Sequence, residues 1–436
     1  MRYSICLFIK CALSVLSLII LFSGNAVATI SFSPHFSTAL SYSDNLDLIP
    51  ENERHDYITT VSPGFDLIVT GRLSDLALSY TPSYATYLRF PENNTLRHNA
   101  SLSASRQMSR TSRLELSHAY LYTEDPLEYQ EYREEPISEI DSTVRQGRQT
   151  YTSNSTELGY VNEFGAEDSV ALRYAYNALE HSNPADEDSE THRPSLGFTW
   201  WPVQSQYGTE TELSYIRRYF DDSEDYNDAA ASFRLIRRLN PHLEYYFEYT
   251  HELTEYVGGS ADYQVYSPVV GFSWDEYVNS SISGSFGYFF QDSDGSESES
   301  GAVGSVETTY RWANLHSISF SGSVGYDRAD TGAENLGFNT FYNVAGGLDY
   351  QLARLLAANF SVSFRRSIYT EEEPDREDSL LSSRIGLSYQ MLPWAALSVS
   401  YEFRDLDSTQ NENDYTENRA FISITMSPRQ PVRLSR

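Results

Sequence analysis

The sequence predicts an all-β protein, a transmembrane antiparallel up-and-down β-barrel of about 20 strands (18–20) with short periplasmic turns and long acidic extracellular loops. Three observations predict this fold class. Apolar and polar residues alternate with a period of two from residue 29 onward. The connections between the alternating segments are short and long in strict turn. Finally, no stretch after residue 28 is apolar enough to cross a bilayer as a helix.

The composition agrees with a folded membrane protein. The 436 residues carry a net charge of −30 and include 34 Tyr and 22 Phe. So many aromatic residues are not typical of a disordered acidic chain, which lacks the apolar side chains to fold. The negative charge argues against nucleic acid as a partner, because phosphate binding needs clustered Lys and Arg.

The first 28 residues are predicted to be a signal peptide. Arg2 and Lys10 supply its positive end, and residues 11–22 form a mostly apolar run. Small residues at 26–28 give a cleavage site near Ala28. The alternative, an uncleaved membrane anchor, is disfavoured because the run is shorter than the ~20 residues that a spanning helix needs.

The mature chain is predicted to be a single barrel over residues 29–427, followed by a polar C-terminal tail over residues 428–436. Both cysteines, Cys6 and Cys11, lie in the signal peptide. The mature protein is therefore expected to have no disulfide and no thiol chemistry.

The segment 316–328 illustrates the alternation. One face carries apolar residues and the other carries serine; these are, respectively, Ile318, Phe320, Gly322, Val324 and Tyr326, and Ser317, Ser319, Ser321 and Ser323. Small polar residues dominate the second face throughout the chain, whereas a soluble surface would carry longer charged side chains. The apolar face ends in aromatic residues, as expected at membrane interfaces, so we expect it to face lipid and the polar face to line a lumen.

The connections supply the strand count. Nine short and ten long ones imply 20 strands, and a sheet in lipid must close on itself so that no edge stays unpaired. Two long loops, 125–148 and 371–378, are strongly acidic. Their carboxylates could bind divalent cations or repel anions at the mouth of the barrel; the alternative is that they only keep a solvated surface soluble.

Charged residues also fall on the predicted lumen face. If the turn near Asn240 sets the pairing, Arg234 faces Tyr246 and lies diagonal to Glu244 and Glu248, which predicts an Arg–Glu ladder. This ladder could stiffen the wall or set the selectivity of a channel. The residues predicted to line the pore are Arg234, Glu244, Tyr246, Glu248, Glu252, Ser319, Ser321, Ser361, Arg365 and Arg384. The longest loop, 125–148, is the predicted constriction, with Glu128, Tyr129, Tyr132 and Glu135 as its presumed contact residues.

No catalytic, cofactor-binding or metal-binding residues are predicted. The nine histidines are scattered singly and form no His-x-x-x-His pair. Glu244 and Glu248, four residues apart on a strand, would be separated by roughly 13 Å, which is too far for a pair of glycosidase carboxylates. The protein is therefore not expected to be an enzyme.

Three stretches within residues 32–107 resemble the putative beta-barrel porin family that is found with exosortase and exopolysaccharide gene clusters in Gram-negative bacteria. The residues that carry the resemblance are Tyr42, Asp44, Asn45, Leu46 and Leu48, then Asp56 to Thr59 and Val61 to Gly64, and finally Leu78, Tyr80, Tyr84, Tyr87, Asn94 and His98. The resemblance implies an outer-membrane barrel close to polysaccharide assembly or export. It implies no catalytic residues.

The favoured function is an outer-membrane pore that passes a hydrophilic glycan or polysaccharide during exopolysaccharide export. The alternatives are a non-conducting scaffold or anchor of a surface-assembly complex, and a general diffusion porin. Expected partners are outer-membrane lipid and lipopolysaccharide, polysaccharide, and periplasmic export proteins. The expected location is the outer membrane of a Gram-negative cell, after cleavage of the signal peptide.

Overall fold

The computed structural model describes residues 29–128, 146–184, 186–203, 206–276, 279–293, 298–313, 315–328, 337–370 and 376–434. The predicted signal peptide lies outside these residues. The strands of the first half are β1 (Thr29–Ser43), β2 (Asp56–Thr70), β3 (Ser74–Tyr87), β4 (Thr95–Gln107), β5 (Ser112–Thr123), β6 (Tyr151–Glu163), β7 (Ser169–His181), β8 (Ser189–Val203), β9 (Tyr207–Phe220) and β10 (Tyr226–Asn240). Those of the second half are β11 (Leu243–Tyr256), β12 (Tyr263–Glu276), β13 (Ser280–Ser293), β14 (Ser300–Trp312), β15 (His316–Arg328), β16 (Phe338–Ala353), β17 (Leu356–Tyr369), β18 (Arg376–Leu392), β19 (Ala395–Ser408), β20 (Tyr415–Met426) and β21 (Val432–Arg433). Two short 3₁₀ turns, η1 (Pro91–Asn93) and η2 (Asn411–Asn413), complete the described elements.

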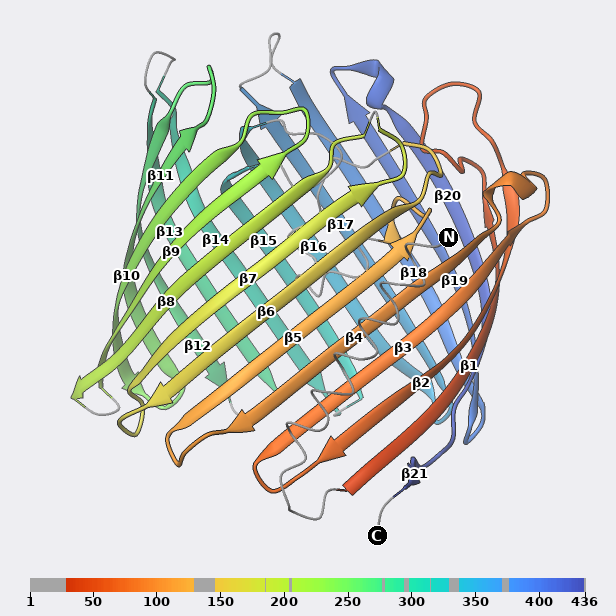
Figure 1. Cartoon of the computed structure of the whole chain (residues 1–436), viewed down its shortest axis with the longest axis horizontal. Coiled ribbons are helices and arrows are strands. Elements are labelled where there is room, and N and C mark those ends of the chain that lie inside the picture. The colour runs from red at the N-terminus through yellow and green to blue at the C-terminus, as the bar shows by residue number, and fades with distance from the viewer. Residues whose placement is uncertain are drawn as a thin grey trace.

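β1 to β20 form a closed antiparallel barrel in which each strand pairs with its neighbours in the chain (Figure 1). β20 closes the barrel by pairing with β1, from Phe36 opposite Met426 to Ser43 opposite Arg419. The predicted fold class is confirmed, and so is the count of 20 barrel strands. No helix within the described residues is long and apolar enough to span a membrane.

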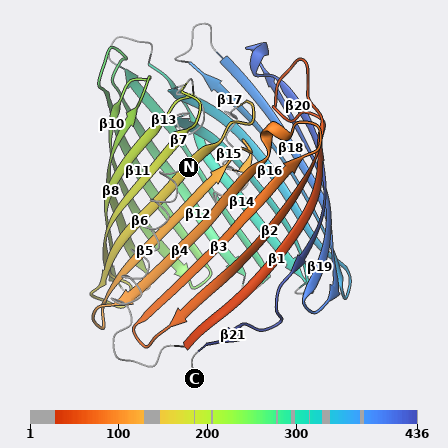
Figure 2. The same ribbon diagram turned by 45° about the vertical axis from the view of Figure 1, so that its right-hand side comes forward.

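The short β21 lies beside β1 at the seam of the barrel (Figure 2). Ser31 is opposite Arg433 and Phe32 is opposite Val432, and the backbone N–H of Leu434 donates to the carbonyl of Ile30 at 2.9 Å. The pairing between β20 and β1 begins only at Phe36, so β21 covers part of the edge of β1 that β20 leaves unpaired. The C-terminal segment thus adds to the wall.

Long and short connections lie at opposite ends of the barrel (Figure 1). We call these the loop end and the turn end. The short connections follow every even-numbered strand up to β18, and the long ones follow every odd-numbered strand.

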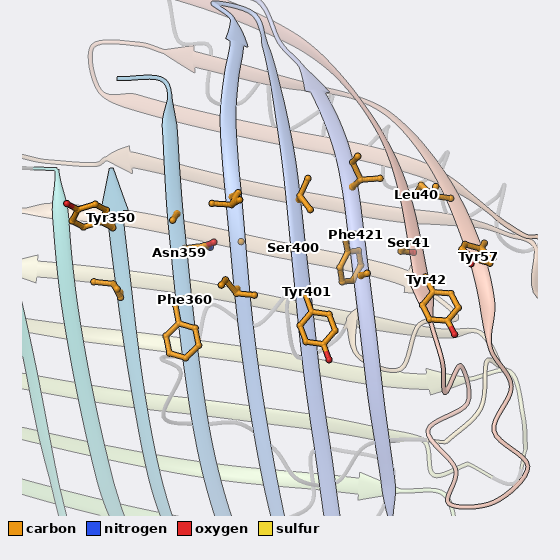
Figure 3. Close-up of a pocket in the computed structure, with 18 residues that line it drawn as sticks. Leu40, Ser41, Tyr42, Tyr57, Tyr350, Asn359, Phe360, Ser400, Tyr401 and Phe421 are labelled. Carbon is orange, nitrogen blue, oxygen red and sulfur yellow. The ribbon is translucent and has the colours of Figure 1, made fainter. Parts of the chain in front are cut away.

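The outer face of the wall is apolar, as the alternation predicts. On the outside of β17 to β20, large side chains such as Phe360, Ile385, Val399 and Ile422 are 45–55% exposed. Phe360, Tyr401 and Tyr42 belong to one row that crosses the strands, and a hollow of about 650 Å³ lies along this row (Figure 3). Exposed aromatic side chains gather near both ends of the strands, for example Tyr57, Tyr84 and Tyr219 at the loop end and Trp200, Tyr207, Tyr245 and Tyr310 at the turn end. These are the two aromatic belts of a membrane-spanning barrel.

One predicted outward residue is an exception. Ile318 and Phe320 are 50% and 45% exposed, as expected. Tyr326, on the same face by sequence, instead donates its hydroxyl hydrogen to the carboxylate of Glu252 at 3.2 Å. The β14–β15 ladder stops at Gly304 opposite Val324, so the tip of the β15–β16 hairpin leaves the wall and turns into the lumen.

Candidate functional site

A ladder of ion pairs crosses the inner faces of β9, β10 and β11. Arg234 donates from Nε to Glu248 at 2.7 Å and from a terminal nitrogen to Glu210 at 3.3 Å, and its guanidinium lies 4.6 Å from the ring centre of Tyr246. One turn-end neighbour, Arg238, contacts Glu244 at 3.6 Å. The predicted Arg–Glu ladder is therefore present in the lumen.

The predicted register of this ladder was wrong by two residues. Arg234 lies directly opposite Glu248, and Tyr246 lies opposite Ile236. The reason is the position of the turn: Asn240 pairs with Leu243 around Pro241 and His242, so the hairpin is centred beyond Asn240. The irregularity between Arg238 and Asn240 removes only one residue of that offset.

The other predicted pore-lining residues lie on the inner wall but on separate strands. Arg384 pairs with Glu402 at 3.0 Å, and Arg365 pairs with Asp327 at 3.4 Å. The three serines belong to the inner faces of β15 and β17, with Ser321 opposite Glu307, Ser319 opposite Gly347, and Ser361 opposite Arg384. The structure does not gather these residues into one site.

A cavity of about 570 Å³ lies in the lumen between the inner faces of β6 to β12 and the inturned tip of the β15–β16 hairpin. Amide and hydroxyl groups line one side, among them Ser153, Ser155 and Asn177, and the rings of Tyr226 and Tyr263 line another. Arg328, at the hairpin tip, contacts Asp228 at 3.1 Å and donates to the Tyr263 hydroxyl. Hydroxyl groups, amides and tyrosine rings offer hydrogen bonds and apolar faces to a polar solute.

Two long connections enter the lumen at the loop end. Leu48 of the β1–β2 connection and Leu127 of the β5–β6 connection are 0% and 1% exposed. They pack on inward side chains of β18, β19 and β20, which are Leu380, Leu406 and Tyr415. Leu46, fully buried, packs on the inner wall at Ile58, Ala85 and Tyr87. The sequence predicted a constriction by loop 125–148 alone; burial of Leu46 and Leu48 places the first connection in the lumen as well.

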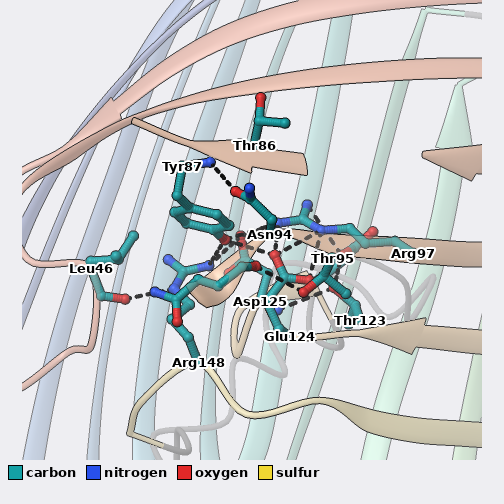
Figure 4. Close-up of polar contacts among 12 residues, drawn as sticks. Leu46, Thr86, Tyr87, Asn94, Thr95, Arg97, Thr123, Glu124, Asp125 and Arg148 are labelled. Carbon is teal, nitrogen blue, oxygen red and sulfur yellow. Dashed lines mark hydrogen bonds and ion pairs between the residues drawn. The ribbon is translucent and has the colours of Figure 1, made fainter. Parts of the chain in front are cut away.

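A buried polar cluster lies next to these leucines (Figure 4). The carboxylate of Asp125 contacts Arg419 at 2.8 Å, Arg148 at 3.0 Å and Arg97 at 3.9 Å. Burial alone would raise the pKa of Asp125, but the three guanidinium groups hold it well below its usual range. The carboxylate therefore stays ionised, and the cluster stays paired.

Glu124 completes the cluster on the side of the wall. It is fully buried, accepts from the guanidinium of Arg97 and accepts the hydroxyl hydrogen of Tyr87 at 2.7 Å. Arg97 and Tyr87 project inward from β4 and β3, so the cluster attaches the β5–β6 connection to two strands.

Glu128 is the one presumed constriction residue within the described part of the chain; Tyr129, Tyr132 and Glu135 lie outside it. Glu128 accepts from the Thr123 hydroxyl and lies 3.6 Å from Arg97. Burial raises the pKa of Glu128.

The motif that follows β1 has a structural role at this site. The amide of Asn45 bridges to both the N–H and the carbonyl of Ile49, at 3.2 and 2.8 Å, and reaches the carbonyl of Thr416 at 3.2 Å. The carboxylate of Asp44 accepts two hydrogen bonds of 2.7 Å from Asn418 of β20. Asp44 and Asn45 thus tie the first connection to the closing strand.

Sequence reasoning did not identify Arg97, Arg148 and Arg419 as site residues. Each arginine lies in or near a different strand, far from the other two in sequence. No regular spacing along the chain connects the three. The available signal was that three arginines fall on or beside predicted inner faces near long loops.

Within the described residues, no group of three or more His, Cys, Asp and Glu side chains is arranged to hold a metal ion.

Comparisons with known proteins confirm the resemblance to a beta-barrel porin family. The model of the family described as putative beta-barrel porin 2 matches residues 218–427, from the end of β9 through β20. Residues 32–107, whose motifs carry the resemblance in the sequence, lie outside this match. No curated protein matches the sequence.

Two solved structures are similar in fold. The FrpB iron transporter of Neisseria meningitidis (F5-1 variant) is 10% identical, with a TM-score of 0.55 over 91% of this chain and 82% of that chain. The siderophore receptor PirA of Pseudomonas aeruginosa is 8% identical, with a TM-score of 0.51 over 91% of this chain and 80% of that chain. At these identities the likeness shows the fold alone.

Proposed function

We propose, from the match of residues 218–427 to the putative beta-barrel porin 2 family, that this porin-like outer-membrane barrel is a pore for a hydrophilic glycan. A barrel of this family in a Gram-negative outer membrane points to transport rather than catalysis.

The small polar side chains of the inner wall are the main support for this proposal. The inner faces of β13, β15 and β17 are rich in serine, for example Ser283, Ser321 and Ser361. Hydroxyl groups of this kind form weak, exchangeable hydrogen bonds and no strong binding site, which suits the passage of a molecule rich in hydroxyl groups. On the other side of the lumen, the Arg234 ladder is internally neutralised by Glu210 and Glu248.

A conductance measurement tests this proposal. Purified barrels in a planar bilayer should carry current, and neutral oligosaccharides added to one side should reduce it transiently and in a concentration-dependent way. Ser321→Trp, which fills space on the lumen face, should lower the current, whereas Val306→Trp on the exposed outer face of β14 should not. Barrels that insert but carry no current would favour the alternative function, a non-conducting scaffold or anchor of a surface-assembly complex.

The resemblance to the exosortase-associated family supports a narrower proposal, namely that the solute is an exopolysaccharide in export. Periplasmic export proteins and lipopolysaccharide would then be the partners of this barrel. Cells that lack the protein should retain the polysaccharide in the periplasm. Normal export together with reduced uptake of small sugars would favour a general diffusion porin.

A further inference from the structure

We infer that Asp125 is the positioning residue of the pore: it holds the β1–β2 and β5–β6 connections inside the lumen and so sets the size of solute that passes. The inference rests on the proposed pore function. It concerns residues 44–55, 124–128 and 146–150, all of which the structure describes.

Asp125 joins three separate parts of the barrel. Arg97 comes from β4, Arg419 from β20, and Arg148 from the connection itself, just before β6. The side chains of Asp125 and Arg148 are 5% and 1% exposed. One carboxylate thus lies among three guanidinium groups with little water to screen them. Removal of its charge would take a carboxylate from Arg148, whereas Arg97 and Arg419 keep their ion pairs with Glu124 and Glu417.

Arg148 transmits this attachment to the other connection. Its Nε donates to the carbonyl of Leu46 at 2.7 Å (Figure 4). The adjacent Gly147 donates its N–H to the carbonyl of Asp47 at 2.8 Å. Gly147 has a φ of 86°, a conformation that favours glycine, so this approach of the two backbones is built into the chain. Arg148 is therefore a second attachment of the first connection, beside the hydrogen bonds of Asp44 and Asn45 to β20, and Arg148 is itself held by Asp125.

The buried leucines indicate that the two connections have one defined position against the inner wall. Leu48 has a φ of 55°, which is rare for a residue with a branched side chain, and it is fully buried between Leu127 and the wall. The surrounding contacts must hold this conformation. Release of the polar attachment at Arg148 would leave the strained segment with its apolar contacts and with the hydrogen bonds of Asp44 and Asn45 at its start. The part of the connection around Leu46 and Leu48 should therefore move away from the wall.

A cysteine on the wall reports this movement directly. Ala85 is 0% exposed and belongs to the cluster that Leu46 covers, and the mature chain is expected to have no other cysteine. In the otherwise unchanged protein, Ala85→Cys should react slowly with a polar maleimide. Asp125→Asn should raise that rate by at least about tenfold, because breaking a buried ion pair by removal of one partner is strongly destabilising.

Glu167→Gln is the control. Glu167 is a half-buried carboxylate that pairs with Arg238 at 2.9 Å in the β6–β7 turn, at the end of the barrel opposite the two connections. It should leave the labelling rate of Ala85→Cys unchanged. If Asp125→Asn fails to insert, Arg148→Met removes the same attachment from the connection side and should give the same increase.

The size limit of the pore is the second readout. Neutral polyethylene glycols of graded size should enter the Asp125→Asn barrel at larger sizes than they enter the wild type, while Glu167→Gln keeps the wild-type limit. Equal labelling and an equal size limit in wild type and Asp125→Asn would overturn the inference and leave the pore function standing. Faster labelling without current in either protein would overturn the pore function, while the attachment of the connections by Asp125 would stand.

Discussion

Two neighbouring residues of β15 face different environments. Phe320 is 45% exposed on the outer face, and Ser321 lies on the inner face opposite Glu307 of β14. We expect Phe320→Arg to lower the free energy of unfolding by roughly 2–4 kcal/mol, because it places a charge in the apolar band of the bilayer. Ser321→Arg should cost much less, since Glu307 can pair with the new cation.

Urea titration of barrels in lipid vesicles, followed by the mobility shift of folded barrels on gels, measures both variants. Equal destabilisation by the two substitutions would contradict the assignment of faces in β15.

The pKa values at the inserted connections predict how they respond to acid. The pKa of Asp125 is held well below its usual range, so its stabilising pairs are fully present above the ordinary Asp pKa of about 3.9 and are lost only as pH falls through the lower folded value. Glu128 has the opposite shift, so its protonation relieves a cost of burial and does not loosen the connection.

A spin label at Gln146→Cys, an exposed position beside Gly147, should therefore keep the same mobility between pH 7 and about pH 4. A rise in mobility centred on the ordinary Asp pKa would show that Asp125 does not hold the connection. A label at Arg429, on the exposed C-terminal segment, controls for effects of pH on the label itself.

At the scale of elements, β21 makes a small but testable contribution. It supplies two residue pairs and one further backbone hydrogen bond to the edge of β1. Deletion of residues 431–436 exposes that edge, and we expect a loss of roughly 1–3 kcal/mol from the missing hydrogen bonds. The temperature at which the folded gel band disappears should fall, whereas Arg429→Ala, which removes no strand pairing, should leave it unchanged. An unaltered temperature after the deletion would show that the β1–β20 pairing closes the seam alone.

The orientation of the whole barrel is a further prediction. The loop end should face the outside of the cell and the turn end the periplasm, as in outer-membrane barrels. Glu92→Cys, at an exposed loop-end position, should react with an impermeant thiol reagent on whole cells. Arg354→Cys, exposed in the turn between β16 and β17, should react only after the outer membrane is opened. The reverse pattern would mean that the barrel is inverted.

The charge of the whole molecule predicts its ion selectivity. With a net charge of −30, and with acidic residues concentrated in the long connections, small cations should permeate better than anions. The preference should weaken as salt is raised, because screening shortens the reach of these charges to about 3 Å at 1 M. Reversal potentials in salt gradients measure it, and an anion preference at low salt would contradict the prediction.

The acidic connections also contact one another. Glu224 accepts the backbone N–H groups of Gly259 and Ser260 at 2.7 and 3.0 Å, and Glu187 accepts those of Asp222 and Ser223 at 2.9 and 3.2 Å. Some of the acidic residues therefore order the loop end, in addition to their contribution to its charge.

The sequence by itself determined the architecture of the wall. The period-two alternation assigned the outer and inner faces of segments such as β15 and β17, and the lengths of the connections predicted the 20 strands. Both signals are local. In a barrel strand, residues two positions apart share a face, so the alternation can be read from the sequence without knowing which strands pair.

Only the tertiary structure decided what lies inside the wall. The alternation placed Tyr326 with Phe320, yet the hairpin tip leaves the β14 ladder and carries it to Glu252. The turn at Pro241 and His242 gave Arg234 a partner other than the predicted one. The meeting of Asp125 with Arg97, Arg148 and Arg419 required the barrel to close. Such contacts join residues that are distant along the chain. They depend on the register and bending of several strands at once, and a two-residue alternation within one strand carries no information about either.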